Sequence, residues 1–334
     1  RRHASAQQHT IMALPDLVKG VLSNGIAGAL LYAVATSLDL ATYVKVALAV
    51  QYGVYLVHGL PCKSERFYDL SGSLTHLCVI GAALVQEAPR TPRQIAVAIA
   101  GVVWCCRLGT FLFLRIEKDG RDERFDSLKK HALRFLGAWT IQALWVSLVQ
   151  LPVVLVNDRV DTAPLGPVDA ALAAIWCASF ILETLADVQK FVWRCDPANK
   201  GKFITVGLWR YARQPNYFGE IFMWLALAAV ATNAATGADD FKRVVWSFGS
   251  PAFTALLLLC VSGLPMVDRA SMKKWGDDPA YLHYVKHTSS VVPWKPAPAF
   301  SKEAAPKKAK AAAAAATPVR RNPARAAKSA AKAE

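Results

Sequence analysis

Residues 135–156 read FLGAWTIQALWVSLVQLPVVLV, a run of 22 residues without a charged side chain. A helix of about 20 apolar residues is long enough to cross the hydrocarbon core of a bilayer. Seven further windows are apolar, five of them free of charge and two interrupted by a few ionisable residues. The uncharged windows are 20–38, 46–62, 70–86, 221–238 and 244–267, and the interrupted ones are 94–114 and 167–189. The sequence therefore predicts an all-α, polytopic membrane helix bundle of about seven or eight transmembrane helices.

The composition agrees with a membrane protein. Of the 334 residues, 54% are hydrophobic and only 19% are charged, whereas soluble domains carry about 25% charged residues. This balance excludes a disordered chain and a disulfide-rich secreted module, and it makes an ordinary soluble enzyme a poor fit. The chain has seven cysteines, an odd number, and no two of them are spaced as a C-x-x-C pair. The sequence therefore predicts neither a disulfide framework nor a metal site.

Basic residues gather on one side of the predicted bundle. With eight helices, the loops 61–69, 115–134 and 190–214 fall on the same side and carry 15 Lys and Arg residues. The loops 87–93, 157–166 and 239–243 on the other side carry five. The excess of basic residues predicts that the three loops and the C-terminus face the cytosol or an equivalent compartment.

The C-terminal segment 297–334 differs from the bundle. It is rich in Ala, Lys and Pro, and no aromatic residue follows Phe300. Because such a segment cannot bury a core, we expect a disordered basic tail. A purely solvated tail and a polybasic contact with anionic lipid or a protein partner both fit this composition. We expect no nucleic-acid partner, because no folded nucleic-acid-binding module accompanies the tail.

The N-terminal extension 1–19 begins with Arg1 and contains no acidic residue before Asp16. This pattern fits the remnant of a processed organelle-targeting segment, although a chain cut at this point would look the same. We therefore expect an integral, multi-pass protein of the endoplasmic reticulum or of an organelle membrane.

Ionisable residues within the predicted membrane helices mark a candidate site. Glu183 and Asp187 are four residues apart and so share one face of a helix, and Arg194 continues this face if the helix extends. Two acids and a base on one stripe suit the hydroxyl groups and a phosphate of a ligand. A structural ion-pair cluster that seals the helix end is the alternative. Arg107 should pair with a carboxylate or with a lipid head group.

Two histidines also lie in apolar windows. We expect His58 and His76 to be hydrogen-bonded core residues, with a polar cavity as the alternative, because their spacing does not suit a metal.

The most informative stretch is 207–220, which reads GLWRYARQPNYFGE. Arg210 and Arg213 place guanidinium groups at a membrane boundary, and Asn216 and Glu220 lie at the start of the next helix. This array suits a phosphate-bearing or otherwise polar cofactor. An interfacial belt of Trp, Tyr and Arg is the alternative, but it does not explain Asn216 or Glu220.

Residues 183–294 resemble the C-terminal domain of the steroid 5-alpha-reductase family. They look most like a large group of related membrane proteins described only as a domain of unknown function. Besides GLWRYARQPNYFGE, the matching pieces are ADVQK (186–190), DPAN (196–199), SGLP (262–265), WGDDPAY (275–281), FYDLSGSLT (67–75) and KDGRDERFD (118–126). The resemblance implies N-terminal membrane helices over 20–132 and a reductase-like membrane domain over 133–296 that binds NADPH.

The resemblance also implies roles for single residues. Glu183 and Asp187 would contact the adenosine and its ribose, whereas Asn216 and Glu220 would hold the nicotinamide half. Arg194 and Arg269 would contact phosphates. The remaining implied cofactor contacts are Arg213, Tyr217, Lys274 and Tyr284. Trp275 departs from the family pattern because relatives have a Tyr there, which removes any role for that hydroxyl.

The implied reaction is hydride transfer from NADPH to a conjugated C=C–C=O group of a lipid-soluble substrate, with an acid that polarises the carbonyl. Family members use a carboxyl group and a Tyr from the N-terminal half. The nearest candidates here are Glu65, Tyr68 and Asp69. An interface anchor is the alternative for Tyr68, and a helix cap is the alternative for Asp69.

Two other functions stay open. Methyltransferases of the isoprenylcysteine and phospholipid type share an Arg-His-Pro core and bind S-adenosylmethionine, but Gln214 stands here in place of that His. A non-enzymatic membrane subunit of a larger assembly could also retain the fold. The basic tail, Gln214 and Trp275 are compatible with such a subunit.

Overall fold

The computed structural model describes residues 2–85, 89–120, 122–159, 162–235 and 241–300. Within these ranges the regular structure is helical, apart from an isolated bridge between Ala212 and Ser289. The all-α prediction is therefore confirmed. The predicted disordered tail lies outside the described residues, apart from 297–300.

Five helical segments in the described part of the chain are long and apolar enough to cross a membrane. They are Pro15–Ser37, Pro92–Glu117, Ala132–Val149, Pro167–Cys195 and Phe241–Trp275. The protein is therefore an integral, multi-pass membrane protein.

The remaining predicted windows are also helical, but they are shorter or interrupted. Helix α2 (Ala41–Val54) continues through a π-helical turn, η1 (Tyr55–Gly59), into α3 (Leu60–Cys62). Helix α4 (Tyr68–Leu84) has 17 residues, and α9 (Pro215–Asn233) begins with polar residues. The count of seven or eight transmembrane helices stays a prediction.

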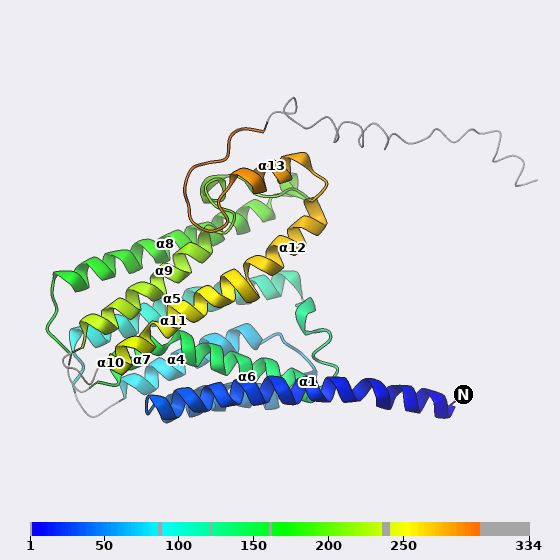
Figure 1. The fold of residues 1–334 in the computed structure, drawn as a ribbon, viewed down its shortest axis with the longest axis horizontal. Coiled ribbons are helices and arrows are strands. Elements are labelled where there is room, and N and C mark those ends of the chain that lie inside the picture. Colours follow the sequence, from blue (N-terminus) through cyan, green and yellow to red (C-terminus); the bar gives the residue numbers. More distant parts are fainter. Residues whose placement is uncertain (1, 86–88, 121, 160–161, 236–240, 301–334) are drawn as a thin grey trace, which may run out of the picture. The chain divides into compact units, whose positions relative to one another are not determined.

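One compact unit comprises Arg1–Asp187 and Asn216–Pro265. In it, α1 (Arg2–Ser37) lies along α6 (Ala132–Val149) (Figure 1). Asn24 Nδ2 donates to the carbonyl of Leu133 at 2.9 Å, and Asn24 Oδ1 accepts from Thr140 at 2.6 Å. A Cβ at Gly20 would come within 3.1 Å of the Arg134 nitrogen, so glycine permits the close approach of α1 and α6.

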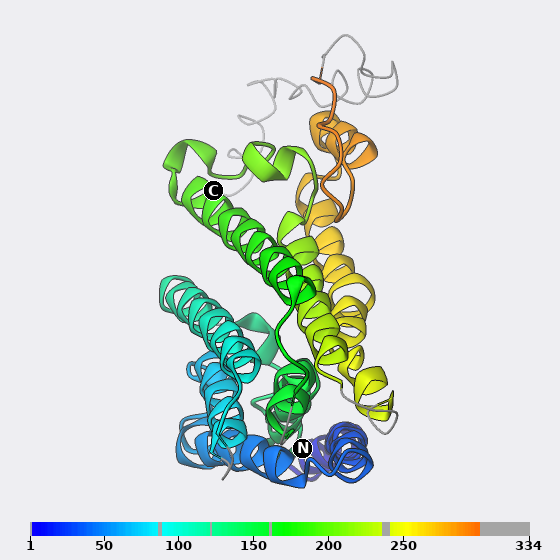
Figure 2. The same cartoon turned by 90° about the vertical axis from the view of Figure 1, so that its left-hand side faces the viewer.

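Two buried clusters form the core of this first unit, one among α1, α2, α4, α6 and α7 (Leu151–Asn157) and the other among α4, α5 (Pro92–Asp119), α6, α7 and α9. Helix α4 lies between α2 and α5, and α6 is followed by the fully buried α7. Pro152 lacks an N–H group, which explains why α6 ends and α7 starts anew inside the predicted window 135–156. Helix α9 lies against the part of α8 (Pro167–Cys195) that belongs to this unit (Figure 2).

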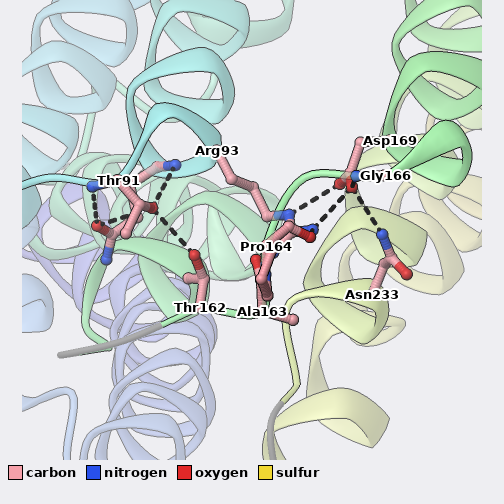
Figure 3. A network of polar contacts seen from close by, with 9 residues as sticks. Thr91, Arg93, Thr162, Ala163, Pro164, Gly166, Asp169 and Asn233 are labelled. Carbon is pink, nitrogen blue, oxygen red and sulfur yellow. Dashed lines mark hydrogen bonds and ion pairs between the residues drawn. The ribbon is translucent and has the colours of Figure 1, made fainter.

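A buried ion pair joins the starts of α5 and α8 to the end of α9 (Figure 3). Arg93 Nε and Nη2 lie 2.8 and 2.7 Å from the two carboxylate oxygens of Asp169, and Arg93 Nη2 also donates to the Pro164 carbonyl at 3.0 Å. Asn233 Nδ2 donates to Asp169 at 3.0 Å. The Arg93 side chain is 2% exposed. A buried charge is tolerated only when it is paired and hydrogen-bonded, and Arg93 and Asp169 meet that condition here.

The second unit comprises Val188–Pro215 and Met266–Glu334. It contains the end of α8, the 3₁₀ turns η3 (Pro197–Asn199) and η4 (Gly207–Arg210), most of α12 (Leu264–Trp275), and α13 (Pro279–His287). Its two chain segments are joined by hydrogen bonds from the Arg213 and Gln214 nitrogens to the carbonyls of Ser289 and Ser290, at 2.8 and 2.9 Å.

Gly207 starts η4 with a φ of +59°, a conformation that favours glycine. A Cβ there would also collide with the Gln189 side chain, whose Oε1 accepts from the Leu208 nitrogen at 2.8 Å. Glycine at the start of the GLWRYARQPNYFGE stretch is therefore required by the backbone conformation, and a Cβ there would also displace the Gln189 side chain.

Candidate functional site

Arg107 of α5 pairs with two carboxylates of α8. Its Nη1 lies 2.9 Å from Glu183 Oε1, and its Nη2 lies 3.0 Å from Asp187 Oδ2. Its Nε donates to Thr184 Oγ1 at 3.2 Å. The prediction that Glu183 and Asp187 share a helix face is confirmed, and of the two partners expected for Arg107 it is the carboxylate that the structure provides.

Helix α9 adds the next polar groups. Asn216 Nδ2 donates to Asp187 Oδ1 at 3.1 Å. Glu220 lies one turn further along, within electrostatic range of Arg107, Glu183 and Asp187. We refer to Arg107, Glu183, Asp187, Asn216 and Glu220 as the carboxylate cluster.

Gly219 brings α9 close enough to α8 to form the carboxylate cluster. A Cβ at Gly219 would lie 2.7 Å from the Ser179 carbonyl oxygen and 2.9 Å from the Glu183 nitrogen. Both neighbours are backbone atoms and cannot move aside independently of their helix. Gly219, in the stretch 207–220, therefore permits the close packing of α8 and α9. The sequence pattern did not predict this role.

The carboxylate cluster has spare acceptor capacity. Glu183 is 2% exposed, and its Oε2 has no hydrogen-bond donor among the described residues. The same holds for the buried Oδ1 of Asn216. Buried polar atoms are normally hydrogen-bonded. Two buried acceptors beside three carboxylates suit a ligand that brings hydroxyl or amide N–H donors, and they do not suit a phosphate.

The other predicted cofactor residues are not part of the carboxylate cluster. Tyr217 lies half-buried on α9 of the first unit. Arg194 and Arg269 belong to the second unit, are exposed, and form no ion pair with the described residues. Exposed cations of this kind remain available for an anionic group.

Three further predicted residues are used inside the second unit. Arg213 Nη1 lies 2.6 Å from Asp268, and its Nη2 donates to Ser290 Oγ at 2.7 Å. Tyr284 donates its hydroxyl to the Trp209 carbonyl at 2.6 Å. Burial raises the pKa of Tyr284, so that its phenol remains a donor. Lys274 Nζ lies 4.6 Å from the centroid of the Trp275 ring.

Trp275 is engaged inside the second unit. Its Nε1 donates to the Gly201 carbonyl at 2.6 Å. The indole N–H is therefore used within the fold.

The predicted catalytic residues lie together at the start of α4, and each has an internal partner. Glu65 Oε2 lies 2.7 Å from Lys129 Nζ. Tyr68 donates to the Ala138 carbonyl at 3.0 Å. Asp69 lies inside the first turn of α4, 3.2 Å from Arg115, so the helix-cap alternative is wrong. None of the three hydrogen-bonds to the carboxylate cluster within the described residues.

The loop beside Glu65 is fixed by further polar contacts. The Asp122 nitrogen donates to Glu65 Oε1 at 3.0 Å. Burial acts to raise the pKa of Asp122, but hydrogen bonds from Arg124 outweigh it and hold that pKa below its ordinary value. The described part of the loop 115–134 is therefore held by ion pairs, among them Arg124 with Asp122 and Lys129 with Glu65.

The two histidines behave differently. His76 is 1% exposed, and its Nδ1 lies 2.9 Å from Gln150 Nε2, between the rings of Trp104 and Trp145. The prediction of a hydrogen-bonded core histidine is thus confirmed for His76. His58 packs edge-on against Phe67 with ring centroids 4.6 Å apart, and its Nε2 has no hydrogen-bond partner in the described part of the chain.

The fold and the carboxylate cluster define a multi-pass membrane protein with buried ionisable side chains between its helices. Residues 55–288 match the family described as "Protein of unknown function (DUF1295)". The match spans more than half of the chain, and the chain therefore belongs to this family. No curated protein and no solved structure matches it. The resemblance to a membrane-protein group of unknown function is confirmed, whereas the reductase activity belongs to the proposal below.

Proposed function

We propose that the protein is a membrane-embedded, NADPH-dependent reductase of a conjugated double bond in a lipid-soluble substrate. The observation that carries the proposal is the carboxylate cluster, with buried free acceptors on Glu183 and Asn216. The resemblance to steroid 5-alpha-reductases assigns contacts with the ribose and nicotinamide parts of NADPH to these same positions.

The chemistry of the cluster fits that part of the cofactor. Ribose hydroxyls and the carboxamide N–H₂ group are donors, and Glu183 Oε2 and Asn216 Oδ1 are acceptors that lack a donor. The phosphates need cations, and the resemblance implies these contacts for Arg194 and Arg269, which are exposed and form no ion pair among the described residues. Arg213 is a weaker candidate because Asp268 and Ser290 already engage its guanidinium.

NADPH, when bound, supplies the hydride. Arg107 holds the carboxylates of Glu183 and Asp187 in fixed orientations, and Asp187 in turn orients the Asn216 amide. One turn away on each helix, the fully buried Trp104 of α5 and Trp224 of α9 pack edge to face at 4.8 Å. This aromatic layer excludes water from the neighbourhood of the cluster, which strengthens its electrostatic interactions.

The acid that polarises the substrate carbonyl stays a proposal among Glu65, Tyr68 and Asp69. Tyr68 is the strongest of them because its O–H is a neutral donor that can exchange the Ala138 carbonyl for a substrate oxygen. Both oxygens of Glu65 are already engaged, by Lys129 Nζ at 2.7 Å and by the Asp122 nitrogen at 3.0 Å.

The activity is tested with the full chain in vesicles that contain a steroid or fatty enone. A reductase consumes NADPH only when the enone is present, and deuterium at the transferred position of the nicotinamide appears at the β-carbon of the product. Asn216→Leu should abolish turnover. Asn233→Leu is a matched control, because Asn233 lies on the same helix and also donates to an aspartate of α8. Equal turnover by the two variants would contradict the assigned site.

One observation favours a non-enzymatic membrane subunit as the second candidate. Glu65, Tyr68, Asp69 and Arg213 each have a partner inside the fold. A relic of a reductase would keep such contacts for stability. It would bind neither NADPH nor S-adenosylmethionine, whereas a methyltransferase would bind S-adenosylmethionine alone.

We further propose that the basic loops and the C-terminus face the cytosol or its equivalent, with seven or eight crossings in the endoplasmic reticulum or an organelle membrane. The excess of Lys and Arg in the loops 61–69, 115–134 and 190–214 supports this orientation.

A further inference from the structure

The second unit contains a pocket that shares no residue with the carboxylate cluster. Its volume is about 460 Å³, within the range of small-molecule sites, about 300–1,000 Å³. The pocket is lined by the loop that follows η3, by α13 and by the segment after α13. Its ionisable lining residues are Lys202, Arg210, Asp278, His283 and Tyr284. The hydroxyl of Tyr284 is already used by the Trp209 carbonyl, which leaves the other four for a ligand.

The segment after α13 forms one wall of the pocket and is held in place by polar and aromatic contacts (Figure 1). His283 Nε2 donates to the Pro298 carbonyl at 3.1 Å, and the ring centroids of His283 and Phe300 lie 5.5 Å apart. The Trp294 nitrogen donates to the Tyr211 carbonyl at 3.4 Å. Because these contacts form the wall without a ligand, binding requires little ordering of the chain.

Two cations line the pocket without a counterion. Lys202 and Arg210 are exposed, and neither side chain has an ion-pair or hydrogen-bond partner among the described residues. Arg213, three residues further on, is by contrast paired with Asp268. An ammonium and a guanidinium group that remain available in one pocket suit a phosphate group.

The acid in the lining of the pocket is Asp278. Its Oδ1 accepts from the Ala280 nitrogen at 2.8 Å and so caps α13. The Asp278 carboxylate forms no ion pair with the described residues, so it does not neutralise the two cations. Its other oxygen can accept a hydrogen bond from a hydroxyl group. A ligand with both phosphate and hydroxyl groups therefore fits better than a bare phosphate, which would leave most of the pocket empty.

The surface of the second unit suits a bilayer. Trp294 is 76% exposed, and Val206 and Tyr211 are exposed as well. Exposed Trp and Tyr side chains are typical of the membrane–water interface. The unit also continues directly from two of the segments long enough to cross a membrane, Pro167–Cys195 and Phe241–Trp275. Its described residues include 11 Lys and Arg against four Asp, and such a basic surface is attracted to anionic lipids.

We propose that the pocket binds the headgroup of an inositol lipid that carries a phosphate monoester. Lys202 and Arg210 hold the phosphate, a ring hydroxyl donates to Asp278, and Trp294 lies among the lipids beside the headgroup. Residues 301–334, which follow the wall of the pocket, carry nine Lys and Arg and two Glu, and this charge is attracted to the same lipids. The site recognises a lipid of the membrane surface and is independent of the substrate and the cofactor of the proposed reductase.

The test measures binding of dioctanoyl phosphatidylinositol 4-phosphate to the full chain purified in detergent, without NADPH. The double variant Lys202→Gln/Arg210→Gln should lose at least about tenfold in affinity, the size of one hydrogen bond to a charged group. The matched control is Lys200→Gln/Lys286→Gln, which removes the same charge from exposed residues of the same unit that do not line the pocket. It should bind as tightly as the wild type. Since all four side chains are exposed, both double variants should unfold at the wild-type temperature.

The phosphate monoester is tested with dioctanoyl phosphatidylinositol, which lacks it and should bind at least about tenfold more weakly. Absence of saturable lipid binding by the wild type, or an equal loss of affinity in both double variants, would overturn the proposal. So would displacement of the lipid by an equal concentration of inorganic phosphate, which would indicate a site for free phosphate, or by NADPH, which would assign the pocket to the cofactor. The proposed reductase is tested separately, because Asn216→Leu should weaken NADPH binding and leave lipid binding unchanged.

Discussion

Nη1 of Arg107 lies 2.9 Å from Oε1 of Glu183, and the two side chains are only 14% and 2% exposed. The pair joins α5 to α8 across 76 residues of sequence. It occupies one oxygen of Glu183 and leaves Oε2 without a donor from the described residues. One contact thus holds the helices together and presents an acceptor to a ligand.

Replacing Arg107 by Leu should destabilise the protein by about 3–5 kcal/mol, because Glu183 and Asp187 would stay buried without their cation. Arg107→Lys should be intermediate, since a single ammonium cannot span both carboxylates as the guanidinium does. Unfolding in detergent, followed by circular dichroism, measures both effects. An Arg107→Leu variant as stable as the wild type would mean that the pair contributes nothing to the fold.

Gly219→Ala should destabilise the protein by about 1–3 kcal/mol, since the added Cβ meets backbone atoms of α8 at 2.7 and 2.9 Å. Gly28→Ala provides the control. A Cβ there meets nothing within 4 Å, and alanine favours a helix by up to about 1 kcal/mol. Opposite shifts in the unfolding temperature are expected. A Gly219→Ala variant as stable as the wild type would show that α8 and α9 are not in tight contact at Gly219.

Arg93→Leu should cost about 3–5 kcal/mol, because Asp169 would remain largely buried without its cation. Asn233→Leu should cost about 1.5–3 kcal/mol, the usual value for a hydrogen bond to a charged group. Thermal unfolding of the single and double variants gives the coupling energy. Full additivity would contradict the network drawn in Figure 3, because residues that share a partner should couple.

Tyr284→Phe separates a structural role from a cofactor role. Loss of the hydroxyl leaves the Trp209 carbonyl without its 2.6 Å hydrogen bond and should cost about 1–3 kcal/mol. If the hydroxyl only supports the fold, the affinity for NADPH stays unchanged at temperatures where the variant is folded. A loss of affinity without a loss of stability would instead place Tyr284 in the cofactor site.

Features that depend on local periodicity and charge could be predicted from the sequence. The uncharged runs predicted the helices, and the four-residue spacing of Glu183 and Asp187 predicted their common face. Arg107 is the one charged residue in the apolar window 94–114, so a buried partner was expected for it. The sequence does not show which of several acids that partner is. That choice depends on the packing of α5 against α8, which no local pattern encodes.

Other features depended on long-range contacts and escaped prediction. Gly219 resembles any helical glycine until α8 is placed 2.7 Å from its missing Cβ. The candidate catalytic residues Glu65 and Asp69 resemble free carboxylates in the sequence, because Lys129 and Arg115 are distant along the chain. The π-helical turn at Tyr55–Gly59 has no local sequence signature.

The central claim is that the carboxylate cluster binds NADPH, and direct binding to the detergent-purified protein tests it most directly. Nicotinamide fluorescence should report saturable NADPH binding by the wild type and by Asn233→Leu, and a loss of at least about tenfold in affinity for Asn216→Leu. S-adenosylmethionine, titrated in parallel, should not bind. Absence of saturable NADPH binding by the folded wild type, or equal affinity of the Asn216→Leu variant, would contradict the claim.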